Sequence, residues 1–254
     1  MTTDIDFINT LADTARKIAV PYFRADYACE TKSDASPVTE ADRAIEAALR
    51  EMIDATYPQD GIIGEEFGIK SGTSGYDWVL DPIDGTRPFM VGLAHFTTLI
   101  SRTKDGLPFL GCIDQPILKD RWIGNGDVTD YNGEMSRSSD TTELADAVIC
   151  STGPTMFYGT DYEASFLNLE KKCKMMHWGG DAMLYASLAS GRVDIVVETD
   201  LAIHDFCALS PIVNGAGGVM TDWDGKSLTT SSDGRVLACA TKELHEKALE
   251  ILTK

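Results

Sequence analysis

The sequence lacks any paired spacing of its cysteines and has a deficit of positive charge. Its six cysteines, at positions 29, 112, 150, 173, 207 and 239, form no C-x-x-C pair and lack the spacing of a secreted disulfide framework. Lys and Arg number 22 against 40 Asp and Glu, which gives a net charge of −18. A chain this acidic repels nucleic acid and anionic membranes, so we expect neither as a partner. The same charge suits metal cations, or a substrate that carries a positive group.

Long apolar runs and a secretory signal are also lacking. No apolar run in the sequence approaches the roughly 20 residues of a membrane span. Residues 1–6 are acidic and lack the basic and apolar regions of a signal peptide. Together with cysteines that read as reduced thiols, these absences predict a cytoplasmic protein.

What is present is the pattern of an α/β protein in two halves. The 254 residues can bury a substantial core, and 43% of them are hydrophobic. We expect an α+β half over residues 1–135 and an α/β half over 136–254. Helices are expected at about 4–22, 39–56, around 166–169, and at 182–190, 205–214 and 243–252. Strands are expected at 62–63, 76–80, 96–103, 109–113, 121–123, 147–150, 193–198, 219–221 and 236–240, with loops at 25–37 and 125–140.

The hexamer DPIDGT, residues 81–86, carries the clearest chemical signal. It follows an apolar strand that Pro82 should end, because proline cannot donate to a sheet ladder. Asp81 and Asp84 would then lie at the carboxyl end of a strand, where open α/β sheets bind ligands. Carboxylates without cysteine or paired histidine favour hard cations such as Mg²⁺. With backbone N–H groups at Gly85 and Thr86 available to an anion, the hexamer predicts a magnesium-dependent site that handles phosphate.

Further acidic positions precede and follow the hexamer. Glu65 and Glu66 come directly after a short strand, so only one of the two side chains should face the site. Asp42 lies in the first turn of the second helix, where Thr39 and Asp42 make a start that resembles a capping box with Asp in place of the usual Glu. Periodicity does not decide whether Asp42 only complements the helix dipole or reaches into a cleft. Asp205 is expected to be the N-cap of a helix that ends near Asn214.

These motifs, taken in order, resemble those of a known family. Gly-Glu-Glu at 64–66, the hexamer at 81–86 and Asp205 ahead of Gly-Ala-Gly-Gly at 215–218 are similar to the inositol monophosphatase family of magnesium-dependent, lithium-sensitive phosphatases. The resemblance extends from residue 4 to residue 254. It implies a layered αβαβα fold, a phosphomonoesterase activity with a small-molecule phosphate ester as substrate, two or three Mg²⁺ ions and a homodimer.

The resemblance also implies a role for each position of the site. The metal ligands would be Glu65, Asp81, the carbonyl group of Ile83, Asp84 and Asp205. The backbone N–H groups of Gly85 and Thr86 would bind the phosphate. Asp42, through the Thr86 hydroxyl, would orient and deprotonate the attacking water.

Within the family, the sequence looks most like the histidinol-phosphate phosphatases. Inositol-specific relatives usually have a small residue where Asp181 stands and Trp-Asp where this chain has His204-Asp205. Histidinol phosphate carries an ammonium and an imidazole group, so its pocket should hold extra acid. Asp181 and Glu198 are the candidates for that acid, and Arg87 could steer the phosphate or pair with a neighbouring carboxylate.

Three alternatives stay open at this point. The substrate could be inositol 1-phosphate or a 3'(2'),5'-nucleotide bisphosphate, although a nucleotide would favour a basic or aromatic pocket. The chain could also be a regulatory or binding member of the family. The net charge of −18 argues against direct RNA contact.

Overall fold

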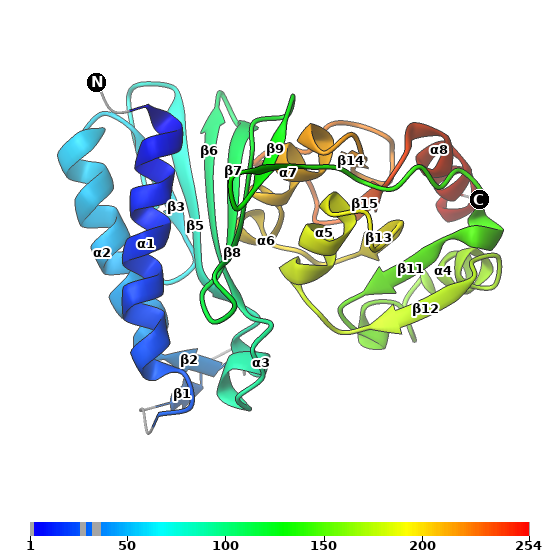
Figure 1. Ribbon diagram of the computed structural model, residues 1–254, viewed down its shortest axis with the longest axis horizontal. Coiled ribbons are helices and arrows are strands. Elements are labelled where there is room, and N and C mark those ends of the chain that lie inside the picture. The colour runs from blue at the N-terminus through cyan, green and yellow to red at the C-terminus, as the bar shows by residue number, and fades with distance from the viewer. Residues whose placement is uncertain (1–2, 26–28, 32–36, 254) are drawn as a thin grey trace.

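A computed structural model describes residues 3–25, 29–31 and 37–253 and shows five alternating layers of helices and sheets (Figure 1). Two long helices cover one face of a large sheet, a middle layer of helices separates this sheet from a second one, and further helices cover the far face of the second sheet. The helices are α1 (Asp4–Tyr22), α2 (Glu40–Thr56), α3 (Thr86–Met90), α4 (Glu163–Glu170), α5 (Ala182–Ala189), α6 (Ile203–Phe206), α7 (Leu209–Gly215) and α8 (Lys242–Leu252). The layered αβαβα architecture expected from the resemblance is confirmed.

The first sheet has eight strands in the order β10-β9-β8-β7-β6-β5-β3-β4, all antiparallel except the pair β3 and β5. Its strands are β3 (Gly61–Gly64), β4 (Gly68–Lys70), β5 (Tyr76–Asp84), β6 (Thr97–Lys104), β7 (Leu107–Gln115), β8 (Asp120–Gly124), β9 (Thr129–Tyr131) and β10 (Glu134–Ser136). The second sheet has the order β12-β11-β13-β15-β14 and mixes parallel with antiparallel pairs. Its strands are β11 (Val148–Ser151), β12 (Met175–Trp178), β13 (Ile195–Glu198), β14 (Val219–Thr221) and β15 (Val236–Cys239).

The first helix forms as its sequence predicts. Thr3 caps α1 by accepting from the backbone N–H of Asp6, and Asp6 accepts from the N–H of Thr3, which makes a capping box. The helix ends at Tyr22, one residue after Pro21. Its buried face, which includes Phe7 and Leu11, packs with α2 on the first sheet.

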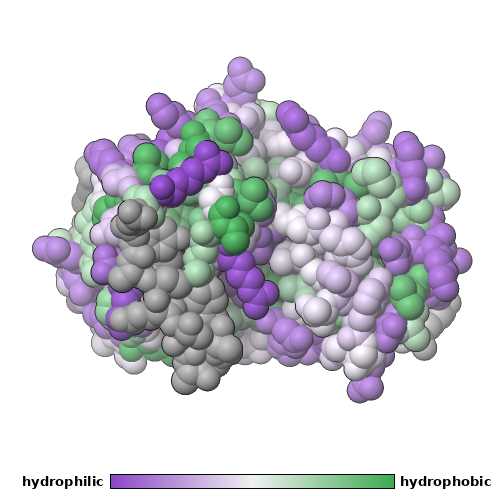
Figure 2. Space-filling model, turned by 90° about the horizontal axis from the view of Figure 1, so that it is seen from below, coloured by the Kyte–Doolittle hydropathy of each residue, from purple (hydrophilic) through white to green (hydrophobic). Residues whose placement is uncertain are grey.

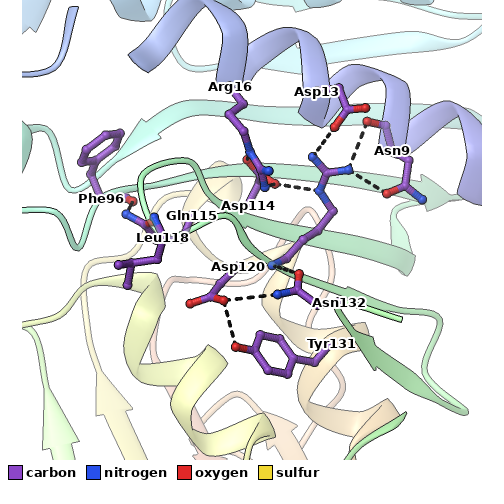
Figure 3. Close-up of polar contacts among 11 residues, drawn as sticks. Asn9, Asp13, Arg16, Phe96, Asp114, Gln115, Leu118, Asp120, Tyr131 and Asn132 are labelled. Atoms are coloured by element: carbon purple, nitrogen blue, oxygen red, sulfur yellow. Dashed lines mark hydrogen bonds and ion pairs between the residues drawn. The ribbon is translucent and has the colours of Figure 1, made fainter. Parts of the chain in front are cut away.

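A buried ion-pair network fastens α1 to that sheet (Figure 3). Asp114 of β7 is fully buried, and its two carboxylate oxygens accept from Arg16 of α1 at 2.5 and 3.1 Å and from Arg121 of β8 at 2.6 Å. Arg121 also donates to Asp13 at 2.7 Å and to Asn9 at 2.8 Å, both on α1. These ion pairs and hydrogen bonds offset the cost of burying the Asp114 side chain.

The expected end of the strand at Pro82 is wrong. β5 continues to Asp84, and its pairing with β6 shifts so that Asp81 opposes Leu99 while Asp84 opposes Thr97. The shift is a bulge, in which the intervening residues leave the regular ladder. A proline fits there because the position does not require a backbone N–H donor.

The expected loop at 125–140 is also wrong, since β9 and β10 form a hairpin within it. Asn132 and Gly133 at its tip have φ angles of 51° and 90°. Asn-Gly is the preferred pair for such a tight hairpin turn, so the signal was present in the sequence but was masked by the polar composition around it. These two short strands extend the first sheet to Ser136.

Two smaller expectations need correction. The expected loop at 25–37 lies partly outside the described residues, and within it β1 (Cys29–Thr31) pairs with β2 (Pro37–Thr39). Asp205 is not the N-cap of a long helix, because Ala202 occupies the N-cap position of the short α6, Asp205 lies within that helix, and α7 begins separately at Leu209. In the part of the chain that the structure describes, no helix is long and apolar enough to cross a membrane.

Candidate functional site

The bulge in β5 lies at the carboxyl end of this strand, where acidic side chains come together. Thr98 supports the bulge by donating its hydroxyl to the carbonyl of Pro82 at 2.7 Å. Carboxylate oxygens of Asp81, Asp84 and Asp205 all lie within 4.8 Å of one another. Asp205 reaches this cluster from α6, where its side chain accepts from the backbone N–H of Ala202 at 2.7 Å. Two segments more than a hundred residues apart in sequence thus form one acidic cluster.

The electrostatics of this cluster fit a hard cation. Burial, followed by the charges of Glu65 and Asp84, raises the pKa of Asp81 well above its usual value. Burial likewise raises the pKa of Asp84 and of Asp205. Among the described residues, Asp81 Oδ1 is buried and has no hydrogen-bond partner. Closely spaced carboxylates with an unsatisfied buried oxygen are a donor set for Mg²⁺ or a similar divalent ion.

Glu65 reaches the site from a loop that is held by a side chain of α2. Glu46 of α2 is fully buried and accepts from the backbone N–H groups of Glu66 at 2.7 Å and Phe67 at 3.1 Å. Glu65 lines the site cavity, whereas Glu66 lies 4.0 Å from Arg43 and is not among the lining residues. The two glutamates therefore face different surroundings. Sequence reasoning missed Glu46, although an acid on an apolar helix face was the available signal.

The cluster forms one wall of a cavity of about 660 Å³ between the two sheets. Figure 2 shows the molecule from below, the side toward which β5 runs to α3, with hydrophilic and hydrophobic residues interspersed over this face. Carboxylates dominate the lining: Glu65, Asp81, Asp84, Asp181, Glu198, Asp200 and Asp205. The basic side chains on the lining are Arg87, His95 and His204. An anionic phosphate would be repelled here unless cations offset these charges.

The predicted phosphate-binding residues lie on this lining. Gly85 has a φ of 80°, and a Cβ there would come within 3.4 Å of the Phe96 backbone and 3.3 Å of Asp181. Thr86 begins α3 and donates its hydroxyl to the Ile83 carbonyl at 3.1 Å. Gly85, Thr86 and Ile83 all line the cavity. Their roles toward phosphate and metal stay predictions.

Asp42 lies buried in the first turn of α2, near the acidic cluster. Its charge contributes to raising the pKa of Asp81. This proximity favours the interpretation that Asp42 belongs to the site over the interpretation that it only complements the helix dipole. Its catalytic role with Thr86 stays a prediction.

Asp181 and Glu198, the predicted substrate contacts, both line the cavity. Asp181 has a φ of 48°, unusual for a residue with a Cβ, and its side chain does not cap α5. Asp84 instead accepts from the backbone N–H of Ala182, the first residue of α5, at 2.8 Å. Asp181 is therefore not an ordinary capping acid. Backbone strain of this kind is common at functional sites.

Arg87 and His95 flank Asp181. His95 Nε2 lies 4.0 Å from Asp181 Oδ2, and the charges of His95 and Arg87 lower the pKa of Asp181 against the stronger raising effect of burial. His95 was not among the predicted site residues, although it lines the cavity. His204 lines the cavity beside Asp205, whose pKa it lowers in part.

Known proteins resemble this chain over nearly its whole length. A sequence model of the inositol monophosphatase family matches residues 1–254. The bifunctional phosphatase IMPL2, chloroplastic, of Arabidopsis thaliana is 41% identical over 254 residues, covering 96% of this chain and 73% of that protein. The histidinol-phosphatase of Mycobacterium tuberculosis is 33% identical over 229 residues, covering 87% of this chain and 88% of that protein.

The fold agrees with these sequence matches. The solved structure of an inositol monophosphatase from Zymomonas mobilis matches with a TM-score of 0.90 and 42% identity, covering 99% of this chain and 98% of that one. The family match covers the whole chain, and it therefore includes the acidic cluster, the cavity and both sheets. The chain belongs to the inositol monophosphatase family, and it is a phosphatase of that family.

Proposed function

We propose that this phosphatase hydrolyses L-histidinol phosphate to L-histidinol and phosphate, a step of histidine biosynthesis. The observation that supports this substrate best is the acidic wall of the cavity beyond the metal-binding cluster. Asp181 and the buried Glu198 lie on this wall, where a neutral substrate would need no such charge. Opposite charges in a partly buried cavity attract strongly, so these carboxylates suit the ammonium and imidazole groups of histidinol phosphate.

The acidic cluster would hold two or three Mg²⁺ ions through Glu65, Asp81, the Ile83 carbonyl, Asp84 and Asp205. When bound there, such ions neutralise phosphate charge and lower the pKa of coordinated water. A phosphate monoester resists attack because its own negative oxygens repel nucleophiles, and this chemistry removes that obstacle.

The remaining steps belong to side chains of this chain. The N–H groups of Gly85 and Thr86 would hold the phosphate oxygens. Asp42 would accept the proton of the attacking water through the Thr86 hydroxyl. The rest of the substrate would be oriented by Asp181, Glu198 and Arg87. Arg87 could either attract the phosphate or pair with the neighbouring carboxylate of Asp181. Gly85, Thr86, Arg87, Asp181 and Glu198 all line the cavity, whereas Asp42 is near enough for its charge to raise the pKa of Asp81.

The experiment that tests the substrate is a parallel assay with Mg²⁺ of three compounds: histidinol phosphate, inositol 1-phosphate and a 3',5'-nucleotide bisphosphate. We expect the highest kcat/KM for histidinol phosphate. Equal or reversed rates would overturn the proposed specificity.

Asp181→Ala should raise the KM for histidinol phosphate and change the KM for a generic phosphate ester less, because only the first substrate carries a positive group near that position.

The alternative substrate with specific support is inositol phosphate, because the solved relative from Zymomonas mobilis is named as an inositol monophosphatase. A nucleotide bisphosphate finds less support, since acidic residues dominate the cavity lining. A regulatory role without catalysis would leave the clustered carboxylates without a function. Loss of phosphate release in every assay, together with intact folding, would favour it.

We also propose a cytoplasmic homodimer. Met90, Val91 and Leu93, which follow the phosphate-binding segment, are exposed apolar side chains that a second copy could cover. Sedimentation of the purified protein tests this, and a monomer at micromolar concentration would contradict it.

A further inference from the structure

Glu198 is held by two hydrogen bonds that come from different elements. Its Oε2 accepts from the hydroxyl of Tyr185 at 2.8 Å, and its Oε1 accepts from the backbone N–H of Thr152 at 2.8 Å. Tyr185 is 1% exposed and Glu198 is 2% exposed, yet both line the cavity. Each carboxylate oxygen thus has a donor on the protein side and further lone pairs for a group in the cavity.

Tyr185 remains a hydrogen-bond donor at any physiological pH. Burial and the charge of Glu198 raise the pKa of Tyr185 well above its usual value, so the hydroxyl stays protonated. Burial raises the pKa of Glu198 to about 7, and the hydrogen bond from Tyr185 opposes part of this rise. Tyr185 therefore favours the charged form of Glu198 as well as fixing its direction.

The position of Tyr185 on α5 links two parts of the site. The N–H of Ala182, at the first residue of the helix, donates to Asp84 of the acidic cluster at 2.8 Å. Tyr185 follows three residues later, about 4.5 Å farther along the axis, and donates to Glu198. One turn of helix thus sets the spacing between the end of the cavity that would hold phosphate and the carboxylate at its other wall.

We propose that Tyr185 is a positioning residue for substrate specificity: it aims Glu198 at a positively charged group of the substrate, at a distance from the phosphate that α5 fixes. This inference rests on the proposed function, because it requires a phosphate ester with a cationic group. The recognised class is a phosphorylated amine or amino alcohol. Tyr185 touches Glu198 rather than the reacting atoms, so its effect should appear in KM and not in kcat.

The test uses Tyr185→Phe, with histidinol phosphate and the uncharged ester p-nitrophenyl phosphate as paired substrates. Loss of one hydrogen bond to a charged group should raise the KM for histidinol phosphate about tenfold. We expect kcat to change less than about twofold and the KM for p-nitrophenyl phosphate to stay constant, since the OH removed does not reach the reacting bond. The pH at which 1/KM for histidinol phosphate is half-maximal should move upward, because Glu198 loses a donor that favours its ionised form.

Tyr131→Phe is the matched control. Its hydroxyl also donates to a carboxylate, Asp120, at 2.8 Å, but Tyr131 is not among the residues that line the cavity. This variant should leave both KM values unchanged. A double mutant supplies the second control: in a Glu198→Gln background, Tyr185→Phe should have little further effect on KM. Equal KM changes for both esters, or an undiminished effect in that background, would overturn the proposal.

A readout without substrate separates this proposal from the proposed function. In protein labelled with ¹³C at the glutamate carboxyl carbon, Tyr185→Phe should raise the pKa of the Glu198 carboxyl, which NMR titration measures. An unchanged pKa would show that Tyr185 does not act through Glu198. If wild-type protein prefers p-nitrophenyl phosphate to histidinol phosphate, the proposed function fails. The NMR result then still decides whether Tyr185 positions Glu198.

Discussion

A single buried carboxylate, Glu198, illustrates how surroundings change residue chemistry. Burial raises its pKa from the ordinary 4.5 to about 7, against the lowering effect of hydrogen bonds from Thr152 and Tyr185. A pKa that is higher in the folded protein means that folding favours the protonated form. This contribution to stability is complete below about pH 4.5 and is lost as the pH rises through about 7.

Glu198→Gln should therefore stabilise the metal-free protein at pH 8. Ionising the buried carboxyl costs roughly 3 kcal/mol for a pKa shift of this size, and glutamine carries no charge. The amide can still accept from Thr152 and donate to Tyr185, so the site stays hydrogen-bonded. We expect Tm to rise by several degrees at pH 8 and to stay unchanged at pH 4.5, as measured by thermal unfolding with EDTA. A Tm that rises equally at both pH values would point to packing instead of charge.

At this scale, motif residues were predictable and their supporting residues were not. Asp81, Asp84 and Asp205 stand in recognisable stretches, and the structure brings their oxygens within 4.8 Å. Glu46 and Tyr185 act through contacts with segments 20 and 13 residues away. For Tyr185 the neighbouring sequence gives no sign of this contact, and for Glu46 it shows only an acid on an apolar helix face without its partners, because the folding of the chain creates these contacts.

At the scale of elements, most helix positions were predicted well, whereas the separation of α6 from α7 and the irregularities of the strands were not. Apolar periodicity places α1, α5 and α8 within a residue or two of their observed bounds. The bulge at Pro82 could not be read from the local sequence, because a bulge depends on the partner strand β6. The bulge is also what gathers Asp81 and Asp84, so the detail that matters most for the site is one that pattern analysis misses.

The junction of α6 and α7 determines where Asp205 lies. It packs on β7 so closely that a Cβ at Gly111 would come within 2.0 Å of the carbonyl oxygen of Ala208. Ser101 of β6 also donates to the carbonyl of Cys207 at 3.0 Å. This docking holds α6, and with it Asp205, against the strand that carries the acidic cluster.

Gly111→Ala should push this junction away from the sheet. Overpacking of this kind costs about 1–3 kcal/mol, which lowers Tm by a few degrees in a protein of this size. Because Asp205 would move with α6, we also expect a weaker affinity for Mg²⁺ in calorimetric titration. Gly153→Ala is the control, since a Cβ there would meet nothing closer than 3.7 Å. Unchanged Mg²⁺ affinity in Gly111→Ala would show that Asp205 is positioned independently of the junction.

For the whole molecule, part of the net charge of −18 is gathered on the lining of the cavity. Sequence composition predicted an acidic protein suited to cations, but it could not locate the charges. The layered fold does so by placing the ends of β5, β13 and α6 around one cavity, which carries seven carboxylates on its lining. The acidic residues therefore do more than keep the protein soluble. Those on the cavity lining lie close enough for their like charges to repel one another and destabilise the fold.

Mg²⁺ should relieve this repulsion, and the effect should depend on pH. The pKa values of Asp81, Asp84 and Asp205 are raised, so their contribution to stability is lost as the pH rises and the carboxyls ionise. Because Mg²⁺ binds the ionised forms, its stabilising effect should grow over the same range. At a concentration 100 times Kd the gain is about 2.7 kcal/mol, which corresponds to several degrees in Tm.

Thermal unfolding with Mg²⁺ or EDTA at pH 8 and pH 5 measures this difference, with NaCl at matched ionic strength as the control for screening. Asp84→Asn should raise Tm in EDTA at pH 8, abolish turnover and remove most of the gain from Mg²⁺, because it deletes one charge of the cluster. Asp127→Asn, at an exposed position outside the cavity lining, should change none of these values. If Mg²⁺ and NaCl raise Tm equally, or if Asp84→Asn keeps the full Mg²⁺ effect, the cluster is not where Mg²⁺ binds.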